Sequence, residues 1–302
     1  MPSTPFHDSL LAQLIERLDR ISTHLERAFP IEDDPPQFHD AIAYHWQRRG
    51  SYGRESMGLR AVLDPSLIAF DALKNIDRQK ALIEQNTWQF VQGLPANNVL
   101  LTGSKGTGKS SLVRACLHAF HEQGLRLIEV DREHLADLPR IVDLLRGRPE
   151  RFILFCDDLS FEDGESGYKG LKTALDGSIA GQPNNCLVYA TSNRRHLLPE
   201  RMADNLSYQR GDDGEVHPGE AVEQKISLSE RFGLWISFYS FSQDEYLIAV
   251  AHWLRNWGIE HDTIRQVRQD AINWATQRGS RSGRIAYQFA KDFVGREGRN
   301  AE

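Results

Sequence analysis

The sequence predicts an α/β protein, in which a five-stranded parallel sheet is sandwiched by helices and is followed by an all-helical C-terminal lid domain. Five short apolar runs, beginning near residues 98, 125, 152, 186 and 234, alternate with amphipathic stretches of helical period. This alternation is typical of strand–helix–strand units with a parallel sheet. Beyond residue 241 the apolar residues recur at helical spacing alone, which predicts a separate helical unit.

The chain divides into three predicted parts. Residues 1–60 form a helical N-terminal extension with a linker, because an amphipathic pattern over residues 8–29 precedes a proline-rich stretch at 30–36. Residues 61–241 form the α/β domain, which includes a long polar loop at 202–228. Residues 242–302 form the lid domain, which begins at Ser242 and Glu245 with the spacing of a capping box.

The composition of the chain excludes several classes of protein. The 302 residues are 40% hydrophobic, enough for a sizeable core. The net charge of -6 does not support a protein that coats nucleic acid. Arginines are interleaved with Trp46 and Tyr52, a pattern that fits either a contact with nucleic acid or a solvated loop. The three cysteines form no C-x-x-C pair, which argues against a disulfide framework or a zinc site. Without a signal sequence or a membrane-length apolar run, we expect a cytoplasmic protein with no membrane partner.

A glycine-rich motif follows the first apolar run of the α/β domain and opens a helix. Its pattern is Gly-x4-Gly-Lys-Ser, which is typical of a phosphate-binding loop. The glycines allow backbone N–H groups to approach a polyphosphate, Lys109 can reach its β- and γ-phosphates, and Ser110 can bind Mg²⁺. The predicted nucleotide-binding residues of this loop are Gly103, Ser104, Lys105, Gly106, Thr107, Gly108, Lys109, Ser110 and Ser111.

Polar residues follow two of the later apolar runs. Asp157 and Asp158 come directly after the run that ends at Cys156, and Asn193 follows the next one. Because these carboxylates come after a phosphate-binding loop in the chain, we predict that Asp157 binds Mg²⁺ and that Asp158 is the general base for an attacking water. Asn193 can orient that water. The alternative readings are a solvated strand end for the carboxylates and a simple turn at Asn193.

Two arginines complete the candidate catalytic set. Arg231 lies in Ser-Glu-Arg-Phe-Gly just before the last strand, where its planar fork suits recognition of a γ-phosphate across a subunit boundary. Arg284, which we prefer to Arg281, opens the last helix and can reach back to the phosphates. Without this context, each of the three would be an ordinary surface arginine.

Over residues 68–294, the sequence resembles the AAA+ ATPases in the order of its motifs. These motifs are the phosphate-binding loop, the acidic strand end, Asn193, the Ser-Glu-Arg-Phe-Gly box and the arginine that opens the last helix. More narrowly, the blocks at 156–161, 190–199 and 231–235 resemble the bacterial AAA-type group called domain of unknown function 815. The resemblance implies a P-loop fold with ATP and Mg²⁺ as cofactors. It also implies a sensor 1 role for Asn193 and a sensor 2 role for Arg284.

The resemblance also implies a homo-oligomer, a ring or partial ring, in which Arg231 acts in trans as an arginine finger. It places adenine near Asn75 and Ile76. The sequence departs from the family at Asp158, where a glutamate is usual, and at Asn75, where a glycine is usual. Because the Asp158 side chain is one methylene shorter, turnover can be slow.

Three functions follow from these patterns. The first is an ATPase that hydrolyses ATP with Mg²⁺ to remodel or recruit an unknown protein partner. The second is a slow ATP-dependent switch or binding module. The third is a DNA-associated ATPase similar to helicase or transposition loaders. A small-molecule kinase would share the phosphate-binding loop but would leave the arginine box and the lid domain unexplained.

Overall fold

A computed structural model describes residues 17–21, 24, 38–51, 54–160, 166–177, 181, 183–193, 209–210, 216–217 and 228–300. The predicted loop at 202–228 therefore lies almost wholly outside the described residues. Residues 17–21 are helical, and most of the amphipathic helix predicted over residues 8–29 lies outside the described residues as well. Among the described helices, none has the length and apolar character needed to cross a membrane.

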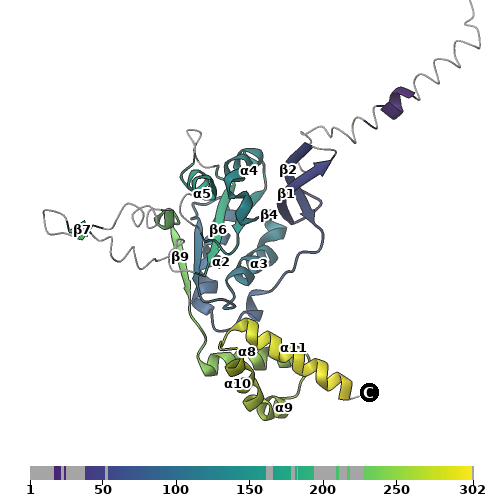
Figure 1. Cartoon of the computed structure of the whole chain (residues 1–302), viewed down its shortest axis with the longest axis vertical. Helices are drawn as coiled ribbons and strands as arrows, with labels where there is room; N and C mark the ends of the chain where they lie inside the picture. The colour runs from purple at the N-terminus through teal and green to yellow at the C-terminus, as the bar shows by residue number, and fades with distance from the viewer. Residues whose placement is uncertain are drawn as a thin grey trace, which may run out of the picture.

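The described sheet of the α/β domain has seven strands, in the order β2-β1-β4-β5-β6-β3-β9 (Figure 1). The five predicted strands are β3, β4, β5, β6 and β9, and all of them run parallel. The predicted α/β fold is thus confirmed, with two further strands. The bounds are Ala43–Ser51 (β1), Arg54–Val62 (β2), Val99–Gly103 (β3), Leu125–Val130 (β4), Arg151–Cys156 (β5), Cys186–Ser192 (β6) and Leu234–Phe238 (β9).

The additional strands correct our prediction of a helical extension with a linker over residues 1–60. β1 pairs parallel with β4 and antiparallel with β2, so a hairpin extends the sheet by two strands. The predicted boundary between residues 60 and 61 falls inside β2. The physical reason is the alternation of large aromatic residues, because Tyr44 and Trp46 point to the same side of β1 and are buried in the core.

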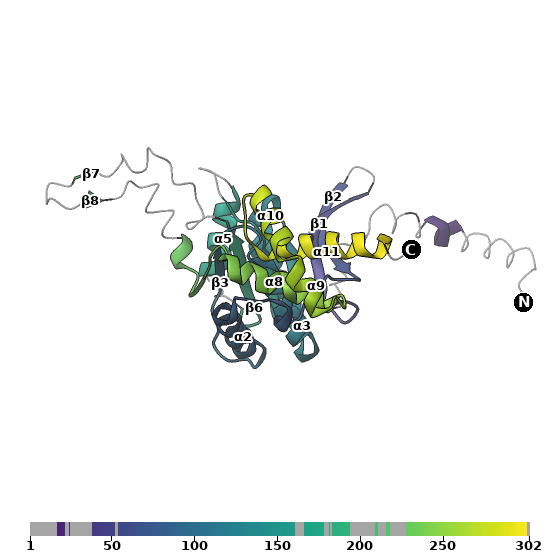
Figure 2. The same cartoon turned by 90° about the horizontal axis from the view of Figure 1, so that it is seen from below.

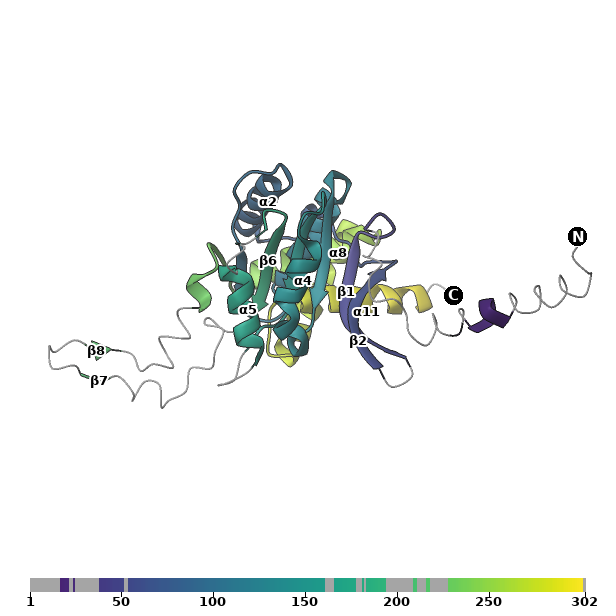
Figure 3. The same ribbon diagram turned by 90° about the horizontal axis from the view of Figure 1, so that it is seen from above.

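Helices cover both faces of the sheet. α2 (Asp77–Val91) and α3 (Lys109–Phe120) pack on one face, and α4 (Leu138–Leu145) and α5 (Ser166–Asp176) pack on the other. Figure 3 shows α4 and α5 side by side. Each face of the sheet has its own hydrophobic core. Within the apolar run of β5, Ile153 packs in the core beneath α2 and α3, and Leu154 packs in the core beneath α4 and α5. A strand that is buried on both faces explains why this run has no polar residue.

The lid domain consists of α8 (Gln243–Asn256), α9 (His261–Gln266), α10 (Arg268–Gln277) and α11 (Gly283–Asn300), which lie together on one side of the α/β domain (Figures 1 and 2). Ser242 and Glu245 form the predicted capping box at the start of α8. The helical spacing of Ile264, Val267, Ala271 and Trp274 fits one continuous helix, but this part of the chain is divided at Val267 into α9 and α10. Tyr246 ties α8 to α10 by donating a hydrogen bond to the Ala271 carbonyl at 3.0 Å.

Candidate nucleotide-binding site

The glycine-rich loop joins the carboxyl end of β3 to the first turn of α3. Gly103, Gly106 and Gly108 have positive φ values of 130°, 76° and 104°, a backbone region that residues with a Cβ rarely adopt. Two of them also permit close packing. A Cβ on Gly103 would overlap the carbonyl of Phe238, and a Cβ on Gly106 would lie 2.8 Å from the Ser282 hydroxyl. The loop conformation therefore depends on glycine for its turn and for its contacts with β9 and the lid domain.

Lys109 opens α3 and is nearly buried. Its ammonium group donates hydrogen bonds to the carbonyls of Gly103 and Ser104, at 2.7 and 2.9 Å, and to Asn193 Oδ1 at 3.0 Å. The backbone N–H groups of this first turn have no side-chain cap, because the N-cap residue is Gly108. A lysine together with the open N-terminus of a helix makes a strong site for an anion.

The environment of Lys109 alters its proton affinity. Burial lowers the pKa of Lys109 to about 8, against the opposing effect of the carboxylates of Asp157 and Asp158. The value of about 8 also includes a smaller lowering of the pKa by the nearby cations Arg284 and Lys105. Positive groups that gather at one point without a matching number of carboxylates favour a highly charged anion such as a polyphosphate.

Ser110 and Asp157 lie next to each other, as the predicted metal site requires. The Ser110 hydroxyl donates a hydrogen bond to Asp157 Oδ1 at 2.7 Å, and the Thr191 hydroxyl donates to the same oxygen at 2.6 Å. A hydroxyl beside a carboxylate at the phosphate-binding loop is a suitable donor set for Mg²⁺, which prefers oxygen ligands and retains several waters.

Asp158 and Asn193 also meet. The amide of Asn193 donates a hydrogen bond to Asp158 Oδ1, while its own oxygen accepts the bond from Lys109. Asp158 has a positive φ of 50°, and its N–H group donates to the Thr191 hydroxyl at 2.9 Å. The structure thus joins Lys109, Asn193 and Asp158 in one cluster at the carboxyl ends of β3, β5 and β6.

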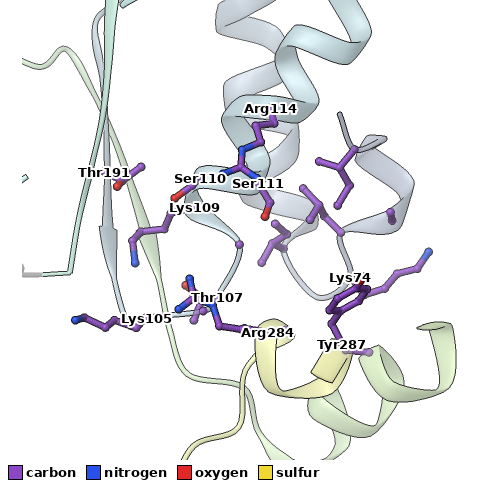
Figure 4. Close-up of a pocket in the computed structure, with 18 of the residues that line it drawn as sticks. Lys74, Lys105, Thr107, Lys109, Ser110, Ser111, Arg114, Thr191, Arg284 and Tyr287 are labelled. Atoms are coloured by element: carbon purple, nitrogen blue, oxygen red, sulfur yellow. The ribbon is translucent and has the colours of Figure 1, made fainter. Parts of the chain in front are cut away.

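Thr191 is a member of this cluster that we did not predict. A signal was present, since residues two apart in a strand point to the same side and Thr191 lies two residues before Asn193. A hydroxyl at that position faces the same edge of the sheet as the residues that follow β5. In Figure 4, Thr191 lies beside Lys109 and Ser110.

The lid domain closes one side of the site. The N–H group of Arg284, in the first turn of α11, donates to the Gly106 carbonyl at 3.1 Å, and its side chain lies beside Thr107 (Figure 4). Arg284 lines the pocket, whereas Arg281 does not. The preference for Arg284 over Arg281 thus agrees with their places in the structure.

The pocket around the loop has a volume of about 680 Å³, within the usual range for a ligand site. Lys105 to Ser111 line it, whereas Gly103 and Ser104 do not. One end is apolar and includes residues of the lid domain that we did not predict, among them Trp253 and Tyr287, whose rings meet edge to face at 4.9 Å. The apolar and aromatic lining residues at this end include Leu67, Ile68, Leu73, Ile76, Trp253 and Tyr287.

The two predicted adenine contacts lie differently. Ile76 lines the pocket and is almost fully buried. Asn75 does not line it. Its backbone has a positive φ of 63°, and its side-chain amide donates to the Glu245 carbonyl in the first turn of α8 at 2.7 Å. Asn75 therefore links the segment before α2 to the lid domain.

Arg231 lies away from the pocket of its own chain. Its Nε atom donates to both carboxylate oxygens of Asp176, at 2.6 and 2.8 Å. β3 and β9 run parallel with Leu234 beside Val99 and Phe238 beside Gly103. Arg231 precedes Leu234 and so lies toward the opposite end of the strands from the phosphate-binding loop.

The fold and this phosphate-binding loop are those of a P-loop protein, and solved structures share the fold. Two solved variants of RuvB from Thermotoga maritima each give a TM-score of 0.50 at 16% identity, over 74% of this chain and 63% of the RuvB chain. A crystal structure of the FIGL-1 AAA domain in complex with ADP gives 0.47 at 17% identity, over 74% of this chain and 72% of that one. At these identities, the likeness to RuvB shows the fold alone, and this chain spans less than two thirds of the RuvB chains.

Within this class, the chain belongs to the family described as protein of unknown function DUF815, whose model matches residues 39–297. The match includes the β1–β2 hairpin as well as the whole α/β domain and most of the lid domain. No curated protein sequence matches the chain significantly.

Proposed function

We propose that this chain is an ATPase, which binds ATP with Mg²⁺, hydrolyses it within a homo-oligomer and uses the cycle to remodel or recruit a macromolecular partner. The observation that carries the proposal is the hydrogen-bonded cluster of Lys109, Asn193 and Asp158 beside the Ser110–Asp157 pair. A cation for the terminal phosphates, a donor set for a metal, a carboxylate and an amide are the groups that ATP hydrolysis needs.

Each residue has its own task in this proposal. Lys109 exchanges carbonyl oxygens for oxygens of the β- and γ-phosphates. Ser110 and Asp157 hold Mg²⁺, which when bound neutralises charge on the phosphate oxygens. Asp158 accepts the proton of the attacking water, and Asn193 orients that water.

The remaining predicted residues complete the site. Arg284 adds a contact from the lid domain to the phosphates. The apolar end of the pocket, with Ile76 and the rings of Trp253 and Tyr287, suits a nucleobase. Arg231 serves the nucleotide of a neighbouring subunit.

A slow ATP-dependent switch is the second candidate function. It is favoured by the hydrogen bond from Asn193 to Asp158, because a carboxylate that is engaged by an amide is less available as a base. The wild-type turnover decides between the two candidates. A rate above about one per second, within the ordinary range for enzymes, argues against the slow switch.

The experiment that tests the proposal uses Asp158→Asn, because asparagine has the same shape and tolerates a positive φ. We expect the variant to bind ATP within about threefold of wild type and to lose about 100-fold or more in turnover, the usual contribution of a general base. Calorimetry gives the affinity and phosphate release gives the rate.

Asp143→Asn is the matched control, since Asp143 is an exposed carboxylate on α4, away from the pocket. It should bind and hydrolyse ATP like wild type. A wild-type chain that binds no ATP would contradict the proposal, and an Asp158→Asn variant with wild-type turnover would remove Asp158 from it.

A further inference from the structure

The last residues of β6 hold the turn that follows β5. The Thr191 carbonyl accepts the N–H of Leu159 at 2.7 Å, and the Ser192 hydroxyl donates to the Leu159 carbonyl at 2.8 Å. The Thr191 hydroxyl donates to Asp157 Oδ1 at 2.6 Å and accepts the N–H of Asp158 at 2.9 Å. One hydroxyl therefore contacts both of the adjacent acidic residues.

The two residues of β6 that make these hydrogen bonds are buried, whereas Asp157 is half-buried and Asp158 is exposed. Thr191 is 2% exposed and Ser192 is fully buried. A buried polar group that loses its partner finds no water to replace it. The side chain of Thr191 thus has a larger influence on its two partners than a surface hydroxyl would have.

The two partners of Thr191 need different kinds of restraint. Asp157 Oδ1 also accepts from Ser110, so the Thr191 hydroxyl determines how this carboxylate faces its fellow metal-site residue. Asp158 has a left-handed backbone at φ 50°, a conformation that persists only when surrounding groups hold it. The hydroxyl oxygen of Thr191 is the acceptor that fixes the amide of this residue.

From this geometry, we infer that Thr191 is a positioning residue, whose hydroxyl sets the metal-site carboxylate of Asp157 and the backbone of Asp158 at once. The inference rests on the proposed function and adds to it a residue that orients Mg²⁺-binding groups without being a ligand. Partners that orient metal ligands commonly change metal affinity or activity by about 10- to 100-fold when they are replaced.

The test compares Thr191→Val with Thr191→Ser. Valine has the shape of threonine but neither donates nor accepts, whereas serine keeps the hydroxyl and loses a methyl group. The main readout is the factor by which Mg²⁺ raises the affinity for ATP, measured by calorimetry in EDTA and in Mg²⁺. The second readout is the Mg²⁺ concentration that gives half-maximal turnover.

For Thr191→Val, we expect ATP affinity in EDTA within about threefold of wild type, a roughly tenfold or greater loss of the Mg²⁺ effect, and a turnover lower by about 10- to 100-fold. Thr191→Ser should restore most of both properties. If the valine variant does not fold, Thr191→Ala against Thr191→Ser makes the same comparison, because these two differ only by the hydroxyl.

Thr87→Val is the matched control for the loss of a buried hydroxyl. Thr87 is fully buried in α2, and its hydroxyl bonds to the Ile83 carbonyl at 2.7 Å and the Tyr189 hydroxyl at 2.8 Å, away from the pocket. It should lower stability and leave the Mg²⁺ effect unchanged.

Two results overturn the inference in distinguishable ways. A wild-type chain that binds no nucleotide overturns the proposed function, and the inference falls with it. A wild type that binds Mg²⁺ and ATP, beside a Thr191→Val variant with the same Mg²⁺ effect and half-maximal Mg²⁺ concentration within about twofold, overturns the inference alone.

Discussion

At the scale of single residues, the proton affinity of Lys109 is determined by its burial and by the charges around it. Its ammonium group binds two loop carbonyls and Asn193, and its pKa is lowered to about 8. A lysine in water stays charged at pH values well above 8. Near pH 8 a substantial fraction of the ligand-free protein therefore has a neutral Lys109.

This shift predicts that ATP binding weakens above pH 8. Phosphates favour the charged lysine, so its pKa is higher in the complex than in the free protein, and binding takes up a proton between these two values. We expect the affinity for ATP to be constant near pH 7 and to fall up to about tenfold per pH unit above pH 8. Calorimetry in buffers of different ionisation enthalpy measures both the affinity and the proton uptake.

Lys109→Arg serves as the control for this pH dependence, because arginine keeps its charge throughout the range. The affinity of the Lys109→Arg variant for ATP will be lower than that of wild type, since a guanidinium differs in shape from an ammonium group. This affinity should change little from pH 7 to pH 9.5. A wild-type affinity that stays constant over this range would contradict the prediction.

At the scale of secondary structure elements, Asn75 joins two parts of the molecule. It precedes α2, and its amide bonds to the Glu245 carbonyl at the start of α8. The positive φ of 63° at this residue is a conformation that asparagine tolerates better than most residues do. The position thus supplies both a turn and a contact with the lid domain.

Replacing Asn75 separates these two contributions. Asn75→Gly loses the hydrogen bond but accepts the backbone, whereas Asn75→Ala loses the hydrogen bond and adds roughly 1 kcal/mol or more for a left-handed residue with a Cβ. We expect Asn75→Ala to lower the free energy of unfolding by about 2 kcal/mol and Asn75→Gly by about half as much. Urea denaturation gives both values.

Asn273, an exposed asparagine within α10, provides the control. Glycine in a helix is less stable than alanine by about 1 kcal/mol, so the order of the two substitutions should be reversed at this position. An Asn75→Ala variant as stable as Asn75→Gly would show that the left-handed backbone does not determine this effect.

The predictable helices and strands are those that are marked by a pattern of residues close together in the sequence. Short, mainly apolar runs predicted β3 to β6 and β9, and the spacing of Ser242 and Glu245 predicted the start of α8. The β1–β2 hairpin was missed because Tyr44 and Trp46 give only a short alternation among arginines and glycines. The division between α9 and α10 occurs at Val267, which is no helix breaker.

The same distinction applies to the candidate site. The positions of the loop, Asp157, Asp158 and Asn193 at strand ends were predictable because each motif has its own local pattern, whereas their roles in hydrolysis stay predictions. Three contacts join residues far apart in sequence, and no spacing indicates them: Asn75 with Glu245, Arg231 with Asp176, and Thr191 with Asp157. They depend on how the strands and the lid domain pack.

At the scale of the whole molecule, the position of Arg231 determines which nucleotide it can serve. Phe238 pairs with Gly103 at the phosphate-binding loop, and Leu234 pairs with Val99 at the other end of β3. The strand from Leu234 to Phe238 alone spans about 13 Å, and Arg231 lies before it, held by Asp176. Under the proposed function, Arg231 therefore contacts a polyphosphate that is bound to another subunit, not the one in its own chain.

This arrangement predicts that two inactive variants restore activity when they are mixed. Lys109→Ala lacks a working loop but keeps Arg231, and Arg231→Ala keeps the loop but lacks the arginine, which typically contributes about 10³-fold or more to turnover. In an equal mixture that assembles at random, about one quarter of the contacts between subunits pair an intact loop with an intact arginine. We expect phosphate release to recover to about that fraction of the wild-type rate.

The mixing control is Lys109→Ala with a double variant that carries both Lys109→Ala and Arg231→Ala, a combination that contains no intact loop and should stay inactive. Loss of the Arg231–Asp176 pair should cost little stability, because the pair is partly exposed, so a misfolded subunit does not explain a loss of turnover. If the first mixture stays as inactive as its two components although both variants assemble with wild type, Arg231 does not act across a subunit boundary. In that case the ion pair of Arg231 with Asp176, at the end of α5, has a structural role, and another cation must serve the γ-phosphate.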